Sequence, residues 1–382
     1  MSLHTRICDI FGIEIPIVLA GMGGASNPEL AAAVSNAGGL GVLGAATCRP
    51  DELREWIQRT RELTDRPFGV DTLLPASVRK APAGGGAASA TSPSPADQLP
   101  EFKRFTTEFM EREGLGEFPS EDDLRKKGFM EDLGALFSKE VFEGQMEVVI
   151  EQKVPVYAAG LGNPGPWVDR LHANGTVVVS VVGAVRHARK AVESGVDVIV
   201  AQGHDAGGHN SPVGTMALVP QVVDAAGDVP VLAAGGIGDG RGVAAALMLG
   251  AEGAWIGSAF LAAEEAGIED YQKQALVEAN EEGTVISRSV TGKPARLIRN
   301  SWARAWEESD FEPLPMPFQS ILAGPVQAAA MRQKRGDVAP GFAGQGIGMI
   351  DSVRPAAEIL REIAEGAART LERAPGFQTN HR

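Results

Sequence analysis

Residues 196–210 read VDVIVAQGHDAGGHN, a mostly apolar run followed at once by a polar, glycine-rich segment. The run over residues 196–200 predicts a buried strand. In the segment behind it, His204, Asp205 and His209 offer polar chemistry, and the glycines let a ligand approach the backbone closely. A strand that ends in this way is typical of the mouth of a binding site, and a solvated polar turn is the alternative.

Seven other apolar runs resemble this strand, and helical segments separate them along the chain. Their positions are apolar almost without interruption, which predicts strands covered on both faces and therefore a parallel sheet. Eight such units predict an α/β fold, the (β/α)8 TIM barrel, with a doubly wound sheet as the alternative. The predicted strands span residues 16–20, 40–44, 68–74, 154–159, 176–182, 196–201, 230–234 and 253–257.

The predicted barrel is interrupted after its third strand. Residues 75–144 form an insertion that contains a low-complexity linker rich in Ala, Gly, Ser and Pro. Phe102, Phe105, Phe109 and Met110 share one helical face there, which predicts packing against the domain; a partner-binding helix is the alternative. Since the insertion leaves the carboxyl end of a barrel strand, we expect a lid or an element that shapes the substrate site.

The length of 382 residues suits one large domain with additions. We expect residues 1–74 and 145–263 to form the barrel and residues 75–144 the insertion. Residues 264–373 are predicted to be a helical extension folded over the barrel, and residues 374–382 a polar tail.

Charge and cysteine content exclude several classes of protein. The net charge of -14 argues against nucleic acid or an anionic membrane as partner. The 2 cysteines provide no disulfide framework, and no run approaches the roughly 18 apolar residues of a membrane helix. No His, Cys and carboxylate set has zinc spacing, so no metal site is predicted. The expected location is a reducing cytoplasm.

Glycines follow the last two predicted strands. Gly235 and Gly236 end the seventh strand, and Gly257 with Ser258 ends the eighth. Exposed backbone N–H groups at such turns, with a helix N-terminus behind them, commonly bind phosphate in barrels. The sequence therefore predicts a phosphorylated ligand, with tight turns that bind nothing as the alternative.

Six blocks of sequence, taken in order, resemble the nitronate monooxygenase family, formerly called 2-nitropropane dioxygenases. The resemblance implies a TIM barrel that binds FMN non-covalently. The wider superfamily also contains FMN-dependent enoyl-thioester reductases and NADH:quinone reductases. The blocks lie in residues 16–44, 68–71, 201–209, 233–242, 260–264 and 343–346.

The resemblance also implies roles for single residues. His209 matches the catalytic histidine of the family. Asp71 stands where the family usually has Asn, and Asp205 replaces a usual Glu. The implied FMN contacts are Ala20, Gly21 and Met22 at the flavin ring, Asp71 or Thr72 from the third strand, Gln202, Ala206, Gly207 and Gly208 beside the cofactor, and Gly235, Gly236, Gly257 and Ser258 at the phosphate.

Three functions are compatible with these features. The first is the FMN-dependent oxidation of alkyl nitronates with O2 to a carbonyl compound and nitrite. The second is an NAD(P)H-dependent flavin reductase for a quinone or an enoyl thioester, and the third is a barrel that binds a phosphorylated ligand without redox chemistry. The sequence leaves open whether NADH or NADPH is a co-substrate and whether the chain forms a homodimer.

Overall fold

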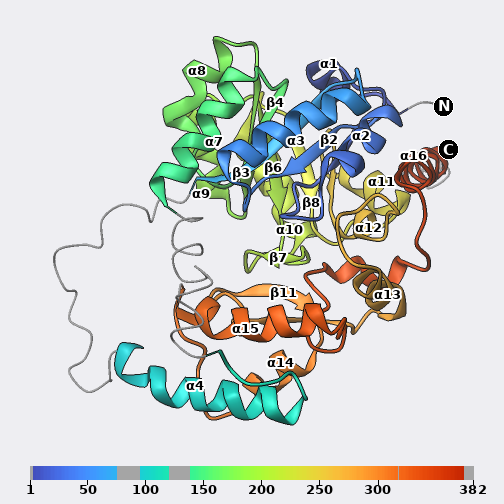
Figure 1. The fold of residues 1–382 in the computed structure, drawn as a ribbon. Coiled ribbons are helices and arrows are strands. Elements are labelled where there is room, and N and C mark those ends of the chain that lie inside the picture. Colours follow the sequence, from blue (N-terminus) through green and yellow to red (C-terminus); the bar gives the residue numbers. More distant parts are fainter. Residues whose placement is uncertain (1–2, 75–94, 120–137, 317, 374–382) are drawn as a thin grey trace.

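The computed structural model describes residues 3–74, 95–119, 138–316 and 318–373. Most of the predicted low-complexity linker and the predicted tail lie outside these residues. The described chain forms a barrel and a smaller layer, which is drawn below the barrel in Figure 1.

Eight parallel strands close into the barrel, in the order β1-β9-β8-β6-β5-β4-β3-β2. The N–H of Leu19 donates to the carbonyl of Leu40 at 2.9 Å, and the N–H of Leu40 donates to the carbonyl of Ile17 at 3.1 Å, so the first and second strands join the two edges. The prediction of a TIM barrel is confirmed. The strands are β1 (Ile17–Leu19), β2 (Gly41–Gly44), β3 (Phe68–Leu74), β4 (Val156–Gly162), β5 (Val177–Val182), β6 (Val198–Gln202), β8 (Val231–Ala234) and β9 (Gly253–Ile256).

Helices cover the outside of the barrel (Figure 1). The last helix that the structure describes, α16, packs against both α11 and α2 and completes the ring of helices. From the sequence, the residues of α16 are predicted to belong to the extension. The structure places them on the barrel, because hydrophobic periodicity does not reveal which surface a helix covers. The helices are α2 (Pro28–Asn36), α3 (Pro50–Leu63), α7 (Lys139–Glu151), η2 (Gly165–Trp167), α8 (Val168–His172), α9 (Val185–Glu193), α10 (Thr215–Ala226), α11 (Gly240–Met248) and α16 (Ala356–Glu372).

Side chains of the strands alternate between the barrel interior and the helix-facing surface. In β6, Val198 and Val200 belong to the interior cluster, whereas Ile199 and Ala201 pack beneath the helices. Both faces are therefore buried, which explains why the strand is apolar at successive positions. The short helix α1 (Arg6–Phe11) adds its buried face to the interior cluster.

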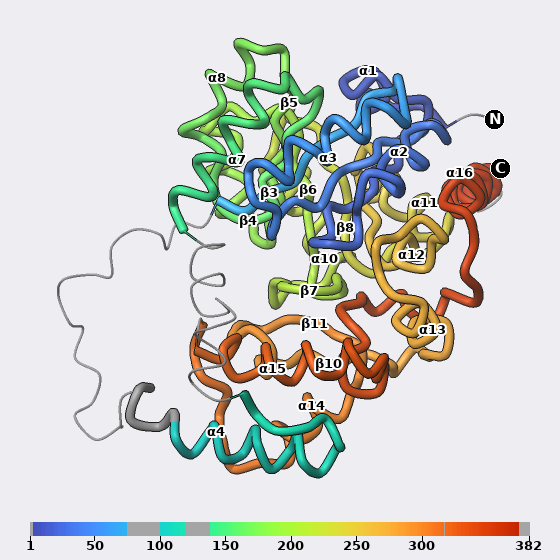
Figure 2. Tube along the Cα trace, viewed as in Figure 1, coloured from blue at the N-terminus to red at the C-terminus, as the bar shows by residue number. Residues whose placement is uncertain are grey.

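A three-stranded antiparallel sheet connects the barrel to the extension. β11 pairs on one side with β10 and on the other with β7, which is part of the loop that follows β6. Figure 2 shows β7 between the barrel and β11. These strands are missing from the sequence prediction because each contains polar residues and lacks the continuous apolar run that marks the barrel strands. The elements are β7 (Gly208–His209), α12 (Ser258–Leu261), α13 (Asp270–Glu278), β10 (Thr284–Ser287), β11 (Ala295–Ile298), α14 (Ser301–Glu307), α15 (Phe318–Arg332) and η3 (Gln345–Met349).

The described part of the insertion packs on this extension. Helix α4 (Pro95–Arg112) directs its apolar face toward α14 and α15. The ring centroids of Phe109 and Trp302 are 4.9 Å apart, and those of Phe105 and Trp306 are 5.0 Å apart. The prediction that this apolar face packs within the chain is confirmed, and its partners are the aromatic residues of the extension.

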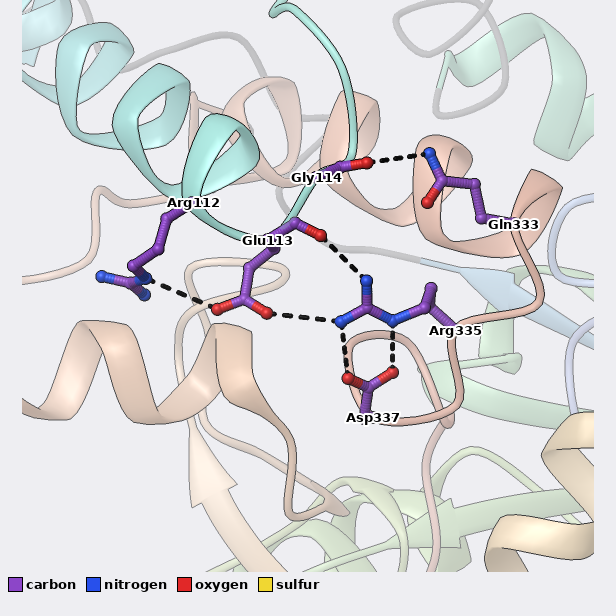
Figure 3. Close-up of polar contacts among 6 residues, drawn as sticks. All are labelled: Arg112, Glu113, Gly114, Gln333, Arg335 and Asp337. Carbon is purple, nitrogen blue, oxygen red and sulfur yellow. Dashed lines mark hydrogen bonds and ion pairs between the residues drawn. The ribbon is translucent and has the colours of Figure 1, made fainter.

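A polar network joins the end of α4 to the segment after α15 (Figure 3). Arg335 donates from Nε and Nη2 to the carboxylate of Asp337, at 2.7 and 2.6 Å. The same guanidinium donates to the carbonyl of Glu113 at 2.9 Å, and Gln333 donates to the carbonyl of Gly114 at 3.2 Å. The insertion is therefore held by backbone contacts as well as by its aromatic face.

We predict that Trp302→Ala destabilises the protein by about 3–5 kcal/mol, because it removes a fully buried indole from the aromatic cluster. It also removes the hydrogen bond from Nε1 to the carbonyl of Ser289. Urea denaturation followed by circular dichroism measures the loss. Met331→Ala, at a side chain that is 49% exposed, is the control and should change stability by less than about 0.5 kcal/mol. Equal effects of the two substitutions would contradict the packing described.

Candidate active site

Two polar residues of the loop after β6 have structural partners. Asp205 accepts a hydrogen bond from the N–H of Thr215 at 2.7 Å, at the start of α10. Its carbonyl accepts another from the N–H of Gln345 at 2.9 Å. The ring of His204 contacts the carbonyl of Ser211 through Nδ1 at 2.9 Å. Asp205 and His204 therefore shape the loop, which leaves His209 as its chemical candidate.

Two glycines after β8 lie directly against this loop. Gly235 and Gly236 have φ of +101° and +72°. A Cβ at Gly235 would lie 2.8 Å from Oγ1 of Thr215, and one at Gly236 would lie 2.9 Å from Cβ of Asp205, so only glycine fits at both positions. Within the described residues, the two N–H groups have no hydrogen-bond acceptor. Unpaired N–H groups of this kind are what an anionic ligand requires.

The segment 343–346 joins the loops that follow three different strands. Its Gly344 N–H donates to Oγ of Ser258 at 2.8 Å, so the hydroxyl hydrogen of Ser258 stays available for a ligand. A Cβ at Gly207 would lie 2.7 Å from the carbonyl carbon of Ala343. Sequence reasoning assigns this segment no role, although it is one of the blocks that carry the family resemblance.

Asp71 is enclosed between two glycines. A Cβ at Gly21 would lie 2.2 Å from Cβ of Asp71, and the N–H of Gly160 donates to Oδ1 of Asp71 at 2.8 Å. Burial raises the pKa of Asp71 well above its usual value, and the hydrogen bond from Gly160 opposes this shift only in part. The buried carboxyl is therefore inclined to hold a proton, and Oδ2 has no hydrogen-bond partner among the described residues.

Thr72 points away from the barrel interior. Its hydroxyl contacts the phenol oxygen of Tyr157 at 2.9 Å, and both side chains are fully buried beneath the helices. Because neighbouring residues in a strand point to opposite faces, Asp71 and Thr72 cannot both face the interior. Of the two alternatives implied by the resemblance, only Asp71 therefore lies on the interior face of β3, against Gly21 and Gly160.

The ends of β1 and β9 lie side by side. A Cβ at Gly257 would lie 3.3 Å from Sδ of Met22 and 3.5 Å from Cβ of Ala20, so residues implied at the flavin ring and at the phosphate are neighbours. Ala206 is buried and its N–H donates to the carbonyl of Gly203, which makes it part of the loop's packing. Gly208, with φ of +70°, has open space where its Cβ would be.

His209 lies on β7, where the extension contacts the barrel loop. Its Nε2 is 3.0 Å from Oγ1 of Thr291, and its carbonyl accepts a hydrogen bond from Nε2 of Gln202 at 3.1 Å. Burial, and secondarily the ammonium group of Lys293, lowers the pKa of His209. The residue nevertheless keeps solvent access. At neutral pH the ring is therefore mostly neutral and can accept a proton or donate a hydrogen bond.

The chain is similar to known proteins over nearly its whole length. A family model described as nitronate monooxygenase matches residues 4–366. The chain belongs to the nitronate monooxygenase family. Membership makes it an oxidoreductase, in agreement with the resemblance found in the sequence. A Mycobacterium tuberculosis protein described as a monooxygenase is 38% identical over 386 residues, covering 98% of this chain and 99% of that protein.

Other relatives carry more specific names. A Bacillus subtilis protein named as a nitronate monooxygenase is 32% identical, over 93% of this chain and 96% of its own length. The solved structure of nitroalkane oxidase from Streptomyces ansochromogenes has a TM-score of 0.79 at 29% identity, covering 97% of this chain and 100% of that one. FabK from Thermotoga maritima has a TM-score of 0.75 at 32% identity, covering 99% and 100%.

The residues at the rim fit the flavin mononucleotide that the family implies. The unpaired N–H groups of Gly235 and Gly236, with the hydroxyl of Ser258, are donors suited to a phosphate. A protonated Asp71 presents one donor and one acceptor, as the amide of Asn does, so the departure at this position preserves the hydrogen-bonding pattern. The chain's own donor set therefore agrees with the cofactor expected from the resemblance.

A cavity of about 470 Å³ lies beside this region, between α11 and α16. It contains none of the four predicted phosphate residues. Four arginines line it: Arg241, Arg354 and Arg369, which pair with acidic residues, and Arg373, which has no ion pair among the described residues. The cavity is thus distinct from the glycine turns after β8 and β9, where the phosphate is predicted.

The described ranges contain no group of three or more His, Cys, Asp or Glu residues that could hold a metal ion. In the same part of the chain, no helix is both long and apolar enough to cross a membrane.

We predict that Asp71→Asn stabilises the apoprotein in a pH-dependent way. The pKa of Asp71 is raised on folding, so the folded state holds more protons and stability falls as pH rises from about 4 through the raised value. Asn cannot ionise and can still accept from Gly160. The melting temperature of the variant should therefore exceed that of the wild type at pH 8, and the difference should shrink at pH 5.

Asp65→Asn, which changes an exposed carboxyl group that has no ion pair among the described residues, is the matched control and should show no such trend. If the melting temperatures of Asp71→Asn and the wild type differ by the same amount at pH 5 and at pH 8, Asp71 ionises normally in the folded protein.

Proposed function

We propose that the chain binds FMN and oxidises alkyl nitronates with O2 to a carbonyl compound and nitrite. The observation that carries this proposal is the position of His209 on β7, in the loop after β6, which pairs with the extension and packs on the glycine turn after β8. FMN, when bound, supplies the electron-transfer chemistry between nitronate and O2. The protein supplies binding, orientation and control of protons.

Cofactor binding uses groups from several strand ends. Gly235, Gly236 and Ser258 would donate hydrogen bonds to the phosphate. Asp71, kept protonated by burial, would donate to an acceptor on the flavin through the carboxyl oxygen that Gly160 does not occupy. A side chain at residue 21 would clash with Asp71, so this position requires glycine. Without a side chain there, the flavin ring could lie close to the backbone.

Substrate chemistry would centre on His209. A neutral imidazole can hydrogen-bond to the nitro group, or remove the α-proton when the neutral nitroalkane binds. The ammonium group of Lys293 acts on His209 electrostatically and would also attract an anionic nitronate. An anionic substrate therefore suits the charge on this side of the site.

The extension and the insertion would form the substrate side of the site. The extension carries Thr291 and Lys293, and α4 packs on its outer face through the aromatic cluster. We therefore interpret the insertion as an element that supports and covers the substrate region. The free cysteines Cys8 and Cys48 are both buried, which suits the reducing cytoplasm that we propose as its location.

His209→Ala should retain bound FMN and lose about 100-fold or more in kcat/KM for a neutral nitroalkane, because it removes the group that takes the α-proton. The measurement is O2 consumption with the purified variant, after its flavin content has been matched to the wild type. His204→Gln, whose amide can still contact Ser211, is the control in the same loop and should keep most activity. Unchanged turnover in His209→Ala would rule out the proposed role of this residue.

Anaerobic mixing separates this function from a reductase. Nitronate should bleach the flavin absorbance of the wild-type holoenzyme, and neither NADH nor NADPH should do so at a comparable rate. Rapid bleaching by a nicotinamide, with none by nitronate, would favour an NAD(P)H-dependent reductase of a quinone or an enoyl thioester. Protein that takes up no FMN would favour the ligand-binding alternative.

A further inference from the structure

The loop between β10 and β11 reaches the candidate catalytic histidine from outside the barrel. Antiparallel pairing of β7 with β11 places His209 opposite Ala295 and Gly208 opposite Arg296. The hydrogen bond from Gln202 to the carbonyl of His209 restrains the backbone from the barrel side. The histidine is thus held on both sides, and its ring meets a single hydroxyl group, that of Thr291, at 3.0 Å.

The hydroxyl of Thr291 has three polar neighbours. Nε2 of His209 is 3.0 Å away, the carbonyl oxygen of Lys293 is 3.3 Å away, and the backbone N–H of Lys293 is also 3.3 Å away. A hydroxyl group has one hydrogen to donate and two lone pairs to accept with. The carbonyl of Lys293 can only accept and its N–H can only donate.

One arrangement satisfies all three contacts. The hydroxyl hydrogen of Thr291 goes to the carbonyl of Lys293, and the two lone pairs accept from the N–H of Lys293 and from Nε2–H of His209. If Thr291 donated to His209 instead, its oxygen would face the carbonyl oxygen of Lys293 at 3.3 Å with no hydrogen between them. The complete set of bonds is therefore available only when Nε2 of His209 carries the hydrogen.

We propose that Thr291 is a positioning residue that holds His209 as its Nε2–H tautomer, so that the lone pair of Nδ1 faces the substrate and takes the α-proton of a neutral nitroalkane, leaving the nitronate and an imidazolium ring. The proposal rests on the function proposed above for His209 and adds which nitrogen acts and what selects it. Nδ1 has no protein hydrogen bond among the described residues, so it is free for this role. In the neutral ring, fixing the hydrogen on one nitrogen fixes the lone pair on the other.

Lys293 supports the same arrangement through its charge. Its ammonium group is the charged neighbour that acts on His209, and it disfavours the doubly protonated ring. The backbone of the same residue provides both of the other contacts of Thr291. One short loop thus selects both the protonation state and the tautomer.

The test is a comparison of wild type, Thr291→Ser and Thr291→Val as FMN-loaded proteins. Histidine labelled with 15N in the ring reports the tautomer by NMR, and His209→Gln identifies the signals by their loss. We expect wild type and Thr291→Ser to show a protonated Nε2 and an unprotonated Nδ1 at pH 8, and Thr291→Val to show a mixture of tautomers. A protonated Nδ1 in the wild type would overturn the proposal.

Turnover gives the second readout. Thr291→Val should lower kcat for a neutral nitroalkane by roughly 10-fold or more at similar KM, because part of the enzyme then presents the wrong nitrogen to the α-proton, and Thr291→Ser should restore it. Loss in both variants, with unchanged tautomers, would mean that the methyl group matters and would also overturn the proposal. If wild type does not oxidise nitronates, the proposed function fails, while the NMR result still decides the tautomer. Should Thr291→Val not fold, wild type and Thr291→Ser still give that result.

Discussion

Parallel hydrogen bonding between the eight barrel strands determines where every residue of the candidate site can lie. Because the strands run in the same direction around a closed ring, the loops after β1, β6, β8 and β9 leave the barrel at one rim. Strand alternation then decides which side chains face inward, so that Asp71 enters the site and Thr72 does not. The rim glycines allow the loops to approach each other closely enough to form a single ligand surface.

The extension provides the other half of the site, and it is attached to the barrel by backbone contacts. Arg296 is buried on β11, and its guanidinium group donates to the carbonyl of His204 at 3.1 Å and to the hydroxyl of Thr284 at 3.2 Å. Burying a cation is costly, and burial lowers the pKa of Arg296, so these contacts must offset a desolvation penalty. Together with the pairing of β7 and β11, they fix the loop that carries His209.

Much of the fold could be predicted from the sequence because its signals are local and repeated. Continuous apolar strands alternating with helices indicated a parallel sheet, the number of such units favoured a barrel over a doubly wound sheet, and glycines after the last two strands predicted a phosphate site. The three-stranded sheet could not be predicted, since its strands lack a continuous apolar run and β7 pairs with β11, far along the chain. The contact between His209 and Thr291, 82 positions apart, likewise depends on tertiary packing.

The roles of individual residues in the candidate site also could not be predicted fully from the sequence. The choice between Asp71 and Thr72 needed the strand register, which a sequence alone does not define to one residue. Asp205 looked like a chemical group beside His209, but its carboxylate is used at the start of α10. Residue types suggested the chemistry, whereas the direction of each side chain came only from the folded chain.

The central claim is that the rim binds a flavin through its phosphate, and an equilibrium titration tests it most directly. Apoprotein is titrated with FMN and, separately, with riboflavin, which lacks only the phosphate, and the quenching of flavin fluorescence is measured. The account predicts one FMN per chain and riboflavin binding weaker by about 100-fold, the loss expected when charge-assisted hydrogen bonds worth roughly 2–3 kcal/mol are removed. Equal affinities, or no binding of either flavin, would contradict it.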